Sequence, residues 1–496
     1  MNTQFYDRVN VQDFGALGDG LHDDAPAIQA ALDSLAKQGG VVYLPAGLYR
    51  MASGVTVPMG VNVEGITTAT TGPWQNYLDT QDKHIPLEDG LALNAVGEAW
   101  IDPRLFKGTW VLSDHGKGEP NGAPTFRMMG NTSIRRVGFV NKYLPPVTEE
   151  ITPCPPCIAH ISTNANPYCR EGVTVEDISL ANCYYGIVIS TGDDLDSNYP
   201  ELNGPYDLSQ SCGRHRIHNI MGGPIYRGIL LKNLLDTVDI HNCQFNMSCY
   251  IPQYWQARRN NCVDIYLCRG DGMSISNVLS YGAYYGIKTE ASFKNNMGTC
   301  SMRVNNCNFE SVTPMVLHSA GLYQIANCYF LGINPERPAG ENEVKCLQII
   351  QPEHCVHNPF ITFTNCVFQL NFDTKAAFID VQLTAGCNPV ISSSQFWGWC
   401  DSKPLINMTK SDSAPGSLTL TDCVFTGNKG AFHLPSEMAG TLAKVDGDGY
   451  HDGELRFVNC RFPETLLDNA SRQRVWYEGC VAYDDEGSNH RIQIGQ

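Results

Sequence analysis

A short segment, Asn-Cys-x-Phe or a close variant, recurs along the chain and limits its fold more than any other feature. The eight cysteines assigned to this slot are Cys183, Cys243, Cys307, Cys328, Cys366, Cys423, Cys460 and Cys480. The shortest spacings, 21 residues from Cys307 to Cys328 and 20 from Cys460 to Cys480, give the size of one repeat. Units of this length are typical of solenoids, in which each repeat contacts only its neighbours.

The second half of each repeat is a short apolar strand that ends in polar residues. Such strands are GIVIST at 186, GILLKN at 228, DIYLCR at 264, GIKTE at 286, MVLHS at 315, CLQIIQ at 346, AFIDVQ at 377 and PLINMT at 404. A unit therefore reads as strand, turn, strand ending in the cysteine segment, turn, with no helix. The pattern predicts an all-β fold, a single-stranded parallel β-helix with long loop insertions.

The repeated cysteine has three interpretations: packing, disulfide bonds or metal ligands. Single cysteines 20 to 60 residues apart do not match the paired spacing of zinc sites, and stacked coils rarely orient cysteines for a disulfide. Packing is favoured, with the cysteine inside and the asparagine bonded to backbone between coils. CPPCIAH at 154, with Cys169, leaves a zinc knuckle open.

The amino terminus predicts a capping helix within HDDAPAIQAALDSLAKQGG, at residue 22 onward. Asp23 or Asp24 would be the N-cap, Pro26 lies in the first turn, and Gly39 and Gly40 end the helix. The apolar face consists of Ile28, Ala31, Leu32 and Leu35. We expect a cap with the first coil over residues 1–50 and one continuous β-helical domain over 51–496.

Residues 9 to 50, VNVQDFGALGDGLHDDAPAIQAAL followed by GGVVYLPAGLYR, resemble the opening of the pectate-lyase superfamily. The resemblance implies a right-handed parallel β-helix and a carbohydrate substrate, as in polygalacturonase-like hydrolases, phage tailspike depolymerases and alginate epimerases. The chain lacks the NTD and GHG elements of polygalacturonases and the YGFDPHE element of alginate epimerases. The reaction is therefore not implied by the resemblance.

Charge and composition exclude other classes of function. The net charge of -17 argues against nucleic acid as a partner, and no apolar stretch reaches the roughly 18 residues of a membrane span. No signal peptide is visible, and 20 cysteines favour a reducing compartment, hence a cytoplasmic protein or, for a phage-encoded chain, a virion component. Long inserts at 66–108, 141–171, 196–213, 246–262 and 332–345 are candidate binding loops.

Aligning the apolar strands brings carboxylates to one turn of three successive coils. Asp193 and Asp194 follow Ile189, Asp236 follows Leu231, and Asp271 follows Leu267, each by four or five positions. Coils stack about 4.8 Å apart, so such carboxylates would lie about 5 to 10 Å from one another. Glycoside hydrolases use carboxyl pairs about 5 to 9.5 Å apart. Aspartates that cap turn amides explain the same pattern.

Other polar residues surround this turn in the alignment. Glu290 and Asp264 are further catalytic candidates, and Asp193, Lys232, Lys288, Arg269, Trp255, Arg258 and Tyr266 are candidates for substrate binding. We expect Lys232, Lys288 and Glu290 on the outward face. In the same alignment of strands, Asp264 lies one step before these positions and Arg269 one step after them. Asp380, Gln382 and Asn407 occupy equivalent outward rows and could extend a groove or be solvated surface.

Three functions remain open. The first is a glycoside hydrolase for a polysaccharide or oligosaccharide, with its acid and base drawn from Asp194, Asp236, Asp271 and Glu290 and with no cofactor. The second is a polysaccharide lyase with a Lys or Arg base, in which Ca²⁺ could neutralise a uronate carboxyl. The third is a glycan-binding fibre segment. A phage tailspike would join enzyme and binding function, and assembly as a homotrimer is left open.

Overall fold

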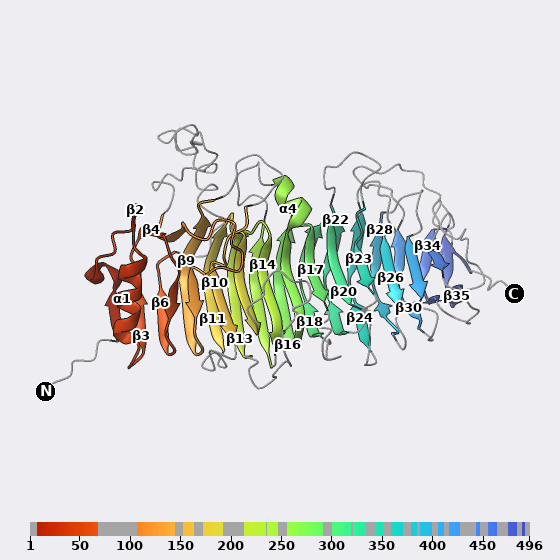
Figure 1. Cartoon of the computed structure of the whole chain (residues 1–496). Coiled ribbons are helices and arrows are strands. Elements are labelled where there is room, and N and C mark those ends of the chain that lie inside the picture. The colour runs from red at the N-terminus through yellow and green to blue at the C-terminus, as the bar shows by residue number, and fades with distance from the viewer. Residues whose placement is uncertain are drawn as a thin grey trace. The chain divides into compact units, whose positions relative to one another are not determined.

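In a computed structural model the chain is a parallel β-helix with an N-terminal helical cap, as the repeat predicts (Figure 1). The structure describes residues 7–67, 107–143, 152–162, 172–191, 213–234, 236–246, 255–290, 300–318, 321–333, 343–350, 359–370, 378–383, 387–398, 405–410, 416–426, 443–446, 455–463, 475–483 and 489–491. It forms two compact units, Met1–Ser274 and Ile275–Gln496, whose boundary falls within strand β16 (Val263–Tyr281). Among the described residues no helix is long and apolar enough to cross a membrane.

Each full coil has three strand segments, which we call faces A, B and C in chain order. In the first unit, face A contains β5 (Val55–Val57), β8 (Phe126–Met128), β10 (Ile158–Ser162), β12 (Tyr185–Thr191), β14 (Arg227–Leu234) and the start of β16. Face B contains β1 (Arg8–Asn10), β3 (Gly40–Tyr43) and β6 (Val61–Glu64), and face C contains β2 (Asp19–Asp23), β4 (Gly47–Met51) and β7 (Thr109–Ser113). Four strands run through B and C: β9 (Thr132–Asn141), β11 (Val173–Ala181), β13 (His215–Gly223) and β15 (Val238–Phe245).

The second unit repeats this order after the end of β16. Face A contains β17 (Tyr285–Glu290), β20 (Thr313–His318), β23 (Leu347–Ile350), β26 (Ile379–Leu383), β29 (Ile406–Lys410) and β32 (Ala443–Asp446). Face B contains β18 (Cys300–Asn305), β21 (Leu322–Ala326), β24 (Phe360–Thr364), β27 (Val390–Ser392), β30 (Leu418–Thr421), β33 (Leu455–Val458) and β35 (Val475–Glu478). Face C contains β19 (Asn308–Ser311), β22 (Tyr329–Gly332), β25 (Val367–Leu370), β28 (Gln395–Trp397), β31 (Val424–Thr426), β34 (Arg461–Pro463) and β36 (Val481–Tyr483). Strand β37 (Asn489–Arg491) is antiparallel to β36.

Helix α1 (Ala25–Leu35) caps the first unit, as predicted. Asp24 is the N-cap residue, and the Asp23 carboxylate accepts a hydrogen bond from the Ala25 amide at 3.2 Å. Ile28, Ala31, Leu32 and Leu35 are buried, and the helix packs against β3, β4 and β5. A 3-10 helix, η1 (Val11–Phe14), precedes it. The apolar stripe thus covers the open end of the coils.

The asparagine of the recurring segment forms the turn between faces B and C. Asn306, Asn327 and Asn365 have φ of 55, 55 and 56°, the left-handed region that asparagine tolerates better than most residues. Their side chains donate to asparagine side chains of the preceding coil and not to backbone, which corrects our prediction. Asn306 donates to Asn277 at 2.6 Å, and Asn365 donates to Asn327 at 2.8 Å. The cysteine and phenylalanine then begin a third strand that we had not predicted.

Cys183 is wrongly assigned to this slot. Register between β11 and β13 places Asp177 opposite Asn219, and both have positive φ, so Asp177 is the B-to-C turn residue of that coil. Asn182 and Cys183 form the next turn, before β12. The error arose because two different turns share the same two letters.

The cysteines and phenylalanines form the core ladders that packing predicts. The 14 cysteines whose side chains the structure describes are buried thiols. Rings of Phe330, Phe368, Phe396, Phe425 and Phe462 stack with centroids 4.6 to 5.0 Å apart. The described cysteines thus lie in the core as thiols, and apolar contact stabilises neighbouring coils.

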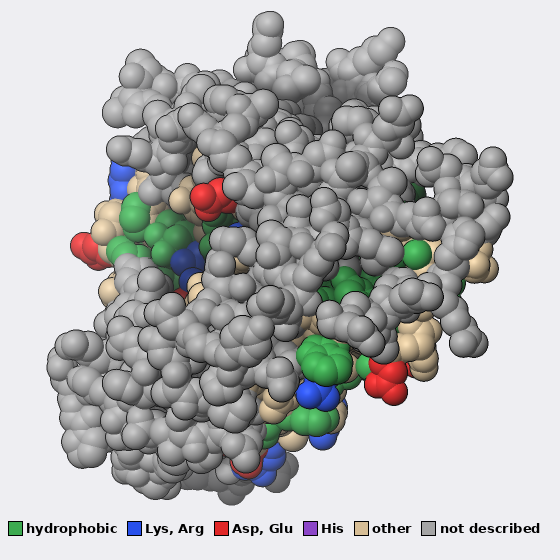
Figure 2. All heavy atoms as spheres, turned by 90° about the vertical axis from the view of Figure 1, so that its right-hand side faces the viewer, with side chains coloured by type: hydrophobic (Ala, Val, Ile, Leu, Met, Phe, Trp, Pro, Cys, Tyr) green, Lys and Arg blue, Asp and Glu red, His purple; other side chains and the backbone are tan. Residues whose placement is uncertain are grey.

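Among the described residues on the side of the molecule seen in Figure 2, side chains of both charges are exposed. Acidic side chains (red) lie near basic (blue) and apolar (green) ones on that side.

Candidate functional site

The best-formed cluster of reactive side chains lies on face A of the second unit. Lys288 and Glu290 are alternate residues of β17, so they project from the same side of the strand. Strand β20 pairs with β17 so that Ile287 lies beside Met315 and Lys288 beside Val316. Continuing this register places His318 beside Glu290 on the neighbouring coil, about 4.8 Å away.

Charge at this cluster is compensated and largely shielded from solvent. The Lys288 ammonium lies 2.6 Å from Glu290 Oε1, with side chains 22% and 9% exposed. Glu290 Oε2 is buried and has no hydrogen-bond partner among the described residues. The ammonium also lies 5.5 Å from the centre of the Tyr285 ring. One carboxylate oxygen is thus held by a cation, while the other accepts no hydrogen bond from the described residues.

His318 is a neutral imidazole at physiological pH. Burial lowers its pKa to about 4, and the nearby Lys288 charge adds to this effect while Glu290 opposes it. Its amide donates to the Thr289 hydroxyl at 2.9 Å, which fixes the two coils at this point. The cluster therefore combines an ammonium, a carboxylate and a neutral imidazole.

The face A row that contains Lys288 continues along the unit with polar residues. Asp380 lies beside Asn407, as the alignment predicts, and Gln348 lies on the other side of Asp380. Gln382 lies beside Thr409. Asp380 accepts from Lys345 at 2.6 Å and from Asn407 at 2.9 Å. This second carboxylate is therefore engaged three coils from Glu290.

The predicted carboxylate stack is described in part. Register confirms that Ile189 lies beside Leu231 and Leu231 beside Leu267, but Asp193 and Asp194 lie outside the described residues. Asp236 is exposed and has a φ of 64°. Continuing the β14–β16 register places it opposite Gly272, which has a φ of 62°. Asp271 precedes Gly272 in the chain and is half-buried. The two aspartates thus occupy neighbouring coils, and the turn geometry alone accounts for Asp236.

Asp264 and Arg258 do not lie on an open face as expected. Both side chains are 0% exposed and form a two-point ion pair, with 2.8 Å for each contact. Arg258 comes from helix α4 (Trp255–Asn261) and also donates to the Pro224 carbonyl at 2.7 Å. The pair therefore attaches α4 to the body of the first unit, because a buried charge requires a partner.

The remaining predicted residues are also buried or outside the description. Lys232 is 1% exposed, Arg269 is 4% exposed with a φ of 60°, and Tyr266 is 4% exposed. The guanidinium of Arg227 lies 5.3 Å from the centre of the Tyr266 ring. Trp255 begins α4, and its side chain lies outside the described part of the structure. The outward face expected for Lys232 is therefore covered.

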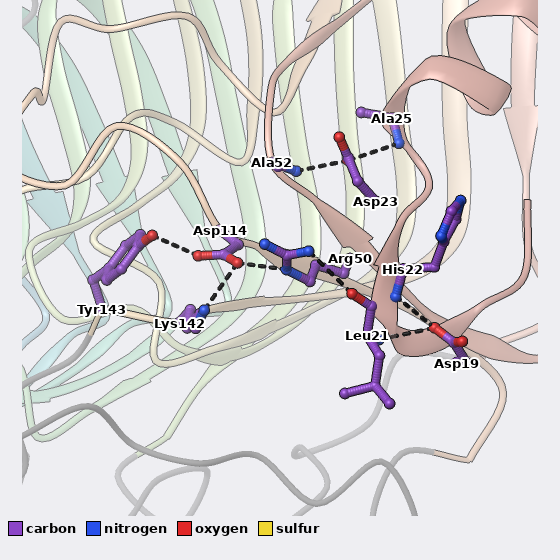
Figure 3. Close-up of polar contacts among 10 residues, drawn as sticks. All are labelled: Asp19, Leu21, His22, Asp23, Ala25, Arg50, Ala52, Asp114, Lys142 and Tyr143. Carbon is purple, nitrogen blue, oxygen red and sulfur yellow. Dashed lines mark hydrogen bonds and ion pairs between the residues drawn. The ribbon is translucent and has the colours of Figure 1, made fainter. Parts of the chain in front are cut away.

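A second charged cluster lies near the cap (Figure 3). Asp114 accepts from Arg50 at 2.5 Å, from Lys142 at 2.9 Å and from the Tyr143 hydroxyl at 2.5 Å. Burial raises the pKa of this carboxyl, but the three donors outweigh it and leave the pKa below its ordinary value. Arg50 also donates to the Leu21 carbonyl at 3.0 Å. Because three donors from separate segments hold this carboxylate, the cluster ties the cap to the first coils.

Metal-ligating residues do not gather in the described part of the chain. No group of three or more His, Cys, Asp or Glu side chains there could hold an ion. Cys154 and Cys157 are free and buried, and burial raises the pKa of Cys154 to about 12. Cys169, the third residue of the zinc-knuckle hypothesis, lies outside the described residues.

Sequence reasoning missed His318 and Asp114. The strand MVLHS at 315 was recognised, and its alignment with GIKTE would have placed His318 beside Glu290. Asp114 had no comparable signal, because its partners come from positions 28 to 64 residues away in the chain.

Comparison with known proteins agrees with this architecture. The family model "Rhamnogalacturonase A/epimerase, pectate lyase-like" matches residues 8–72. Mannuronan C5-epimerase AlgE3 of Azotobacter vinelandii is 36% identical over 147 residues, which is 27% of this chain and 7% of that protein. The chain thus covers a small part of that relative's length.

Two solved structures share the fold at low identity. The C387A mutant of DFA-IIIase from Arthrobacter chlorophenolicus A6 aligns with 96% of this chain and 99% of its own, at 12% identity and a TM-score of 0.51. The pre-mature gene product 12 of bacteriophage phi29 aligns with 96% of this chain and 56% of its own, at 14% identity and a TM-score of 0.56. The chain is thus a parallel β-helix protein with a pectate-lyase-like segment at residues 8–72.

Proposed function

We propose that this protein is a carbohydrate-active enzyme and that Lys288, Glu290 and His318 form its active site. The observation that carries the proposal is the contact of an ammonium with one oxygen of a carboxylate whose other oxygen is free, beside a neutral imidazole. The epimerase named above, which is similar to 27% of this chain, supports carbohydrate as the substrate class.

The geometry best supports proton abstraction from a uronate-containing glycan. Glu290 would take the proton on the carbon beside the sugar carboxyl, while Lys288 and the neutral N–H of His318 stabilise the negative charge that develops. Expulsion of the neighbouring glycosidic oxygen, which receives a proton from water, then forms a carbon–carbon double bond. Return of a proton to the opposite face of the sugar gives an epimer instead. If the sugar carboxyl needs a second cation, Ca²⁺ is expected because it prefers oxygen ligands.

Substitution of Glu290 provides the main test. We expect Glu290→Gln to lower the rate on a uronate glycan by about 100-fold or more, because general-base catalysis contributes about 10² to 10⁴. Ultraviolet absorbance of the new double bond detects elimination, and proton NMR detects epimers. Both are followed with and without added Ca²⁺.

Asp380→Asn is the matched control for this experiment. Asp380 is also a lysine-paired carboxylate of face A, with a side chain 14% exposed, but it is three coils from Glu290. Its variant should keep wild-type activity. Equal losses in the two variants, or full activity in Glu290→Gln, would refute the assignment.

A glycoside hydrolase is the second candidate, favoured by Asp236 and Asp271 on neighbouring coils of the first unit. Hydrolysis releases reducing ends without forming a double bond. If Asp236→Asn and Asp271→Asn abolish the release of reducing ends while Glu290→Gln does not, the hydrolase replaces the lyase or epimerase.

A further inference from the structure

A groove runs along the B-to-C turns of the second unit, on a part of the coil that includes none of the proposed catalytic residues. Its volume is about 660 Å³, within the range of roughly 300 to 1,000 Å³ common for ligand sites. Four asparagines line it, one from each of four turns: Asn277, Asn306, Asn327 and Asn365.

The asparagines offer a regular series of hydrogen-bonding groups. Each is exposed, and each amide has two N–H groups and two acceptor positions, of which the contacts along the turns use only a part. Asn306 donates to Asn277, Asn365 to Asn327, and Asn327 to Asn305 at 2.8 Å. These contacts fix the orientation of the amides. Their remaining donors and acceptors therefore recur once per coil, about every 4.8 Å.

The wall of the groove comes from face C and is partly apolar. Leu279, Asn308, Tyr329 and Val367 are successive neighbours across strands β16, β19, β22 and β25. The Tyr329 hydroxyl donates to Gln369, so the ring is held in place. A fixed aromatic ring beside a row of amides is typical of a surface that binds sugars, whose faces are apolar and whose edges carry hydroxyls.

Asn308 has capacity for a ligand. Its amide nitrogen donates to Glu310 Oε1 at 2.9 Å, whereas its Oδ1 is buried with no hydrogen-bond partner among the described residues. An unsatisfied buried acceptor costs about 1 to 3 kcal/mol. A ligand hydroxyl can donate to this oxygen once the amide rotates, which exchanges the contact with Glu310 for a contact with the ligand.

The absence of charged side chains among the described residues that line the groove indicates an uncharged ligand. Among the residues that line the groove there is no Lys, Arg, Asp or Glu. The Glu310 carboxylate accepts a hydrogen bond from Asn308 of the groove, and its negative charge disfavours an anionic ligand. A sulfated, phosphorylated or uronate-rich chain therefore lacks a partner here, and hydroxyl groups match the amides.

We propose that this groove binds an uncharged, hydroxyl-rich carbohydrate chain that lies along the coil axis, at a site separate from Lys288, Glu290 and His318. The site holds the chain and performs no chemistry. It does not depend on the reaction proposed above, because binding is measured independently of turnover.

The test uses the full chain with Glu290→Gln, so that no ligand is consumed. Neutral gluco-, manno-, galacto- and xylo-oligosaccharides of increasing length are titrated by calorimetry. We expect at least one series to bind, more tightly with increasing length, and the added pair Asn306→Gly and Asn327→Gly to weaken binding at least tenfold. Glycine keeps the positive-φ turn, and Gly479 already occupies this turn position.

Asn459→Gly is the matched control, because Asn459 is a turn residue of the same series, with a φ of 52°, that does not line the groove. This variant should bind as the parent does.

The proposal would be overturned if no neutral series bound, or if the Asn306→Gly, Asn327→Gly variant bound as tightly as the parent. Stronger binding of uronate than of neutral oligosaccharides at this site would also overturn it. Self-association of the chain would overturn it as well, if light scattering showed that it depends on concentration and that the double variant abolishes it. A second copy of the chain would then occupy the groove.

Discussion

At the scale of single residues, the one-residue turn between faces B and C is the most repeated constraint. Asparagine is preferred there because the turn requires a positive φ and because its amide can reach the next coil. Arg136, Ser393, Asp422 and Gly479 hold equivalent turns with φ of 60, 49, 53 and 65°. Backbone conformation is thus the stricter requirement, and the amide contact is an addition.

Because backbone conformation is the stricter requirement, two substitutions of Asn365 should differ in how much they lower the free energy of unfolding. Asn365→Ala places a Cβ in a left-handed conformation that costs about 1 to 2 kcal/mol, whereas Asn365→Gly avoids that cost. We expect Asn365→Ala to have a free energy of unfolding about 1 kcal/mol lower than that of Asn365→Gly. Urea denaturation checks the difference, and equal stabilities of the two variants would show that the positive φ adds no measurable cost for a residue with a Cβ.

His318 gives a second residue-scale prediction. Its pKa of about 4 lies below the unfolded value of about 6.5, so the unfolded chain binds more protons between these pH values. Stability from the neutral form is therefore complete above about pH 6.5 and is lost as pH falls toward 4, by up to about 3 kcal/mol. His318→Asn should show a shallower fall over this window in denaturation measured at several pH values. Identical slopes for variant and wild type would contradict this.

At the scale of elements, strands and the cap were predictable from sequence, whereas α4 was not. The helix α1 follows from local signals, namely a carboxylate cap, an early proline and an apolar stripe. The strands follow from alternation, and aligning two of them would also have related Lys288 and Glu290 to His318, although this relation was missed. The burial of Arg258 and Asp264 depends on how an insertion folds back onto the coils, and no local pattern encodes that contact.

The attachment of α4 can be tested through this ion pair. Arg258→Met leaves Asp264 buried without its charge partner, so we expect the free energy of unfolding to fall by about 3 to 5 kcal/mol. Adding Asp264→Leu removes the isolated charge and should recover most of the loss. Thermal and urea denaturation of the two variants make the comparison. Equal destabilisation of the two would show that side-chain packing, and not charge, attaches the helix.

At the scale of the whole molecule, the division into two compact units was not visible in the sequence, because the repeat continues through residue 274 without a change in composition. A solenoid is stabilised by contacts between neighbouring coils, so damage to one coil should spread over a limited distance. The proposed site and the groove both belong to the second unit, and each can be studied there without altering the cap.

Phe396 tests this locality. Its ring stacks between Phe368 and Phe425 at 5.0 and 4.6 Å, so Phe396→Ala should cost about 3 to 5 kcal/mol. Hydrogen exchange followed by mass spectrometry should show faster exchange in β25, β28 and β31, with protection of the first unit unchanged. Uniform loss of protection in both units would mean that the chain unfolds as one block.

The buried thiols have a consequence for kinetics. In the recurring slot the sulfur atoms of Cys243, Cys307, Cys366 and Cys423 point toward carbonyl groups in the interior, and none of these residues is more than 4% exposed. A thiol reagent can modify each one only while its own coil is open. The rate at which each cysteine is modified therefore reports how often its own coil opens. Comparing these rates along the chain would give the order in which the coils of the solenoid unfold.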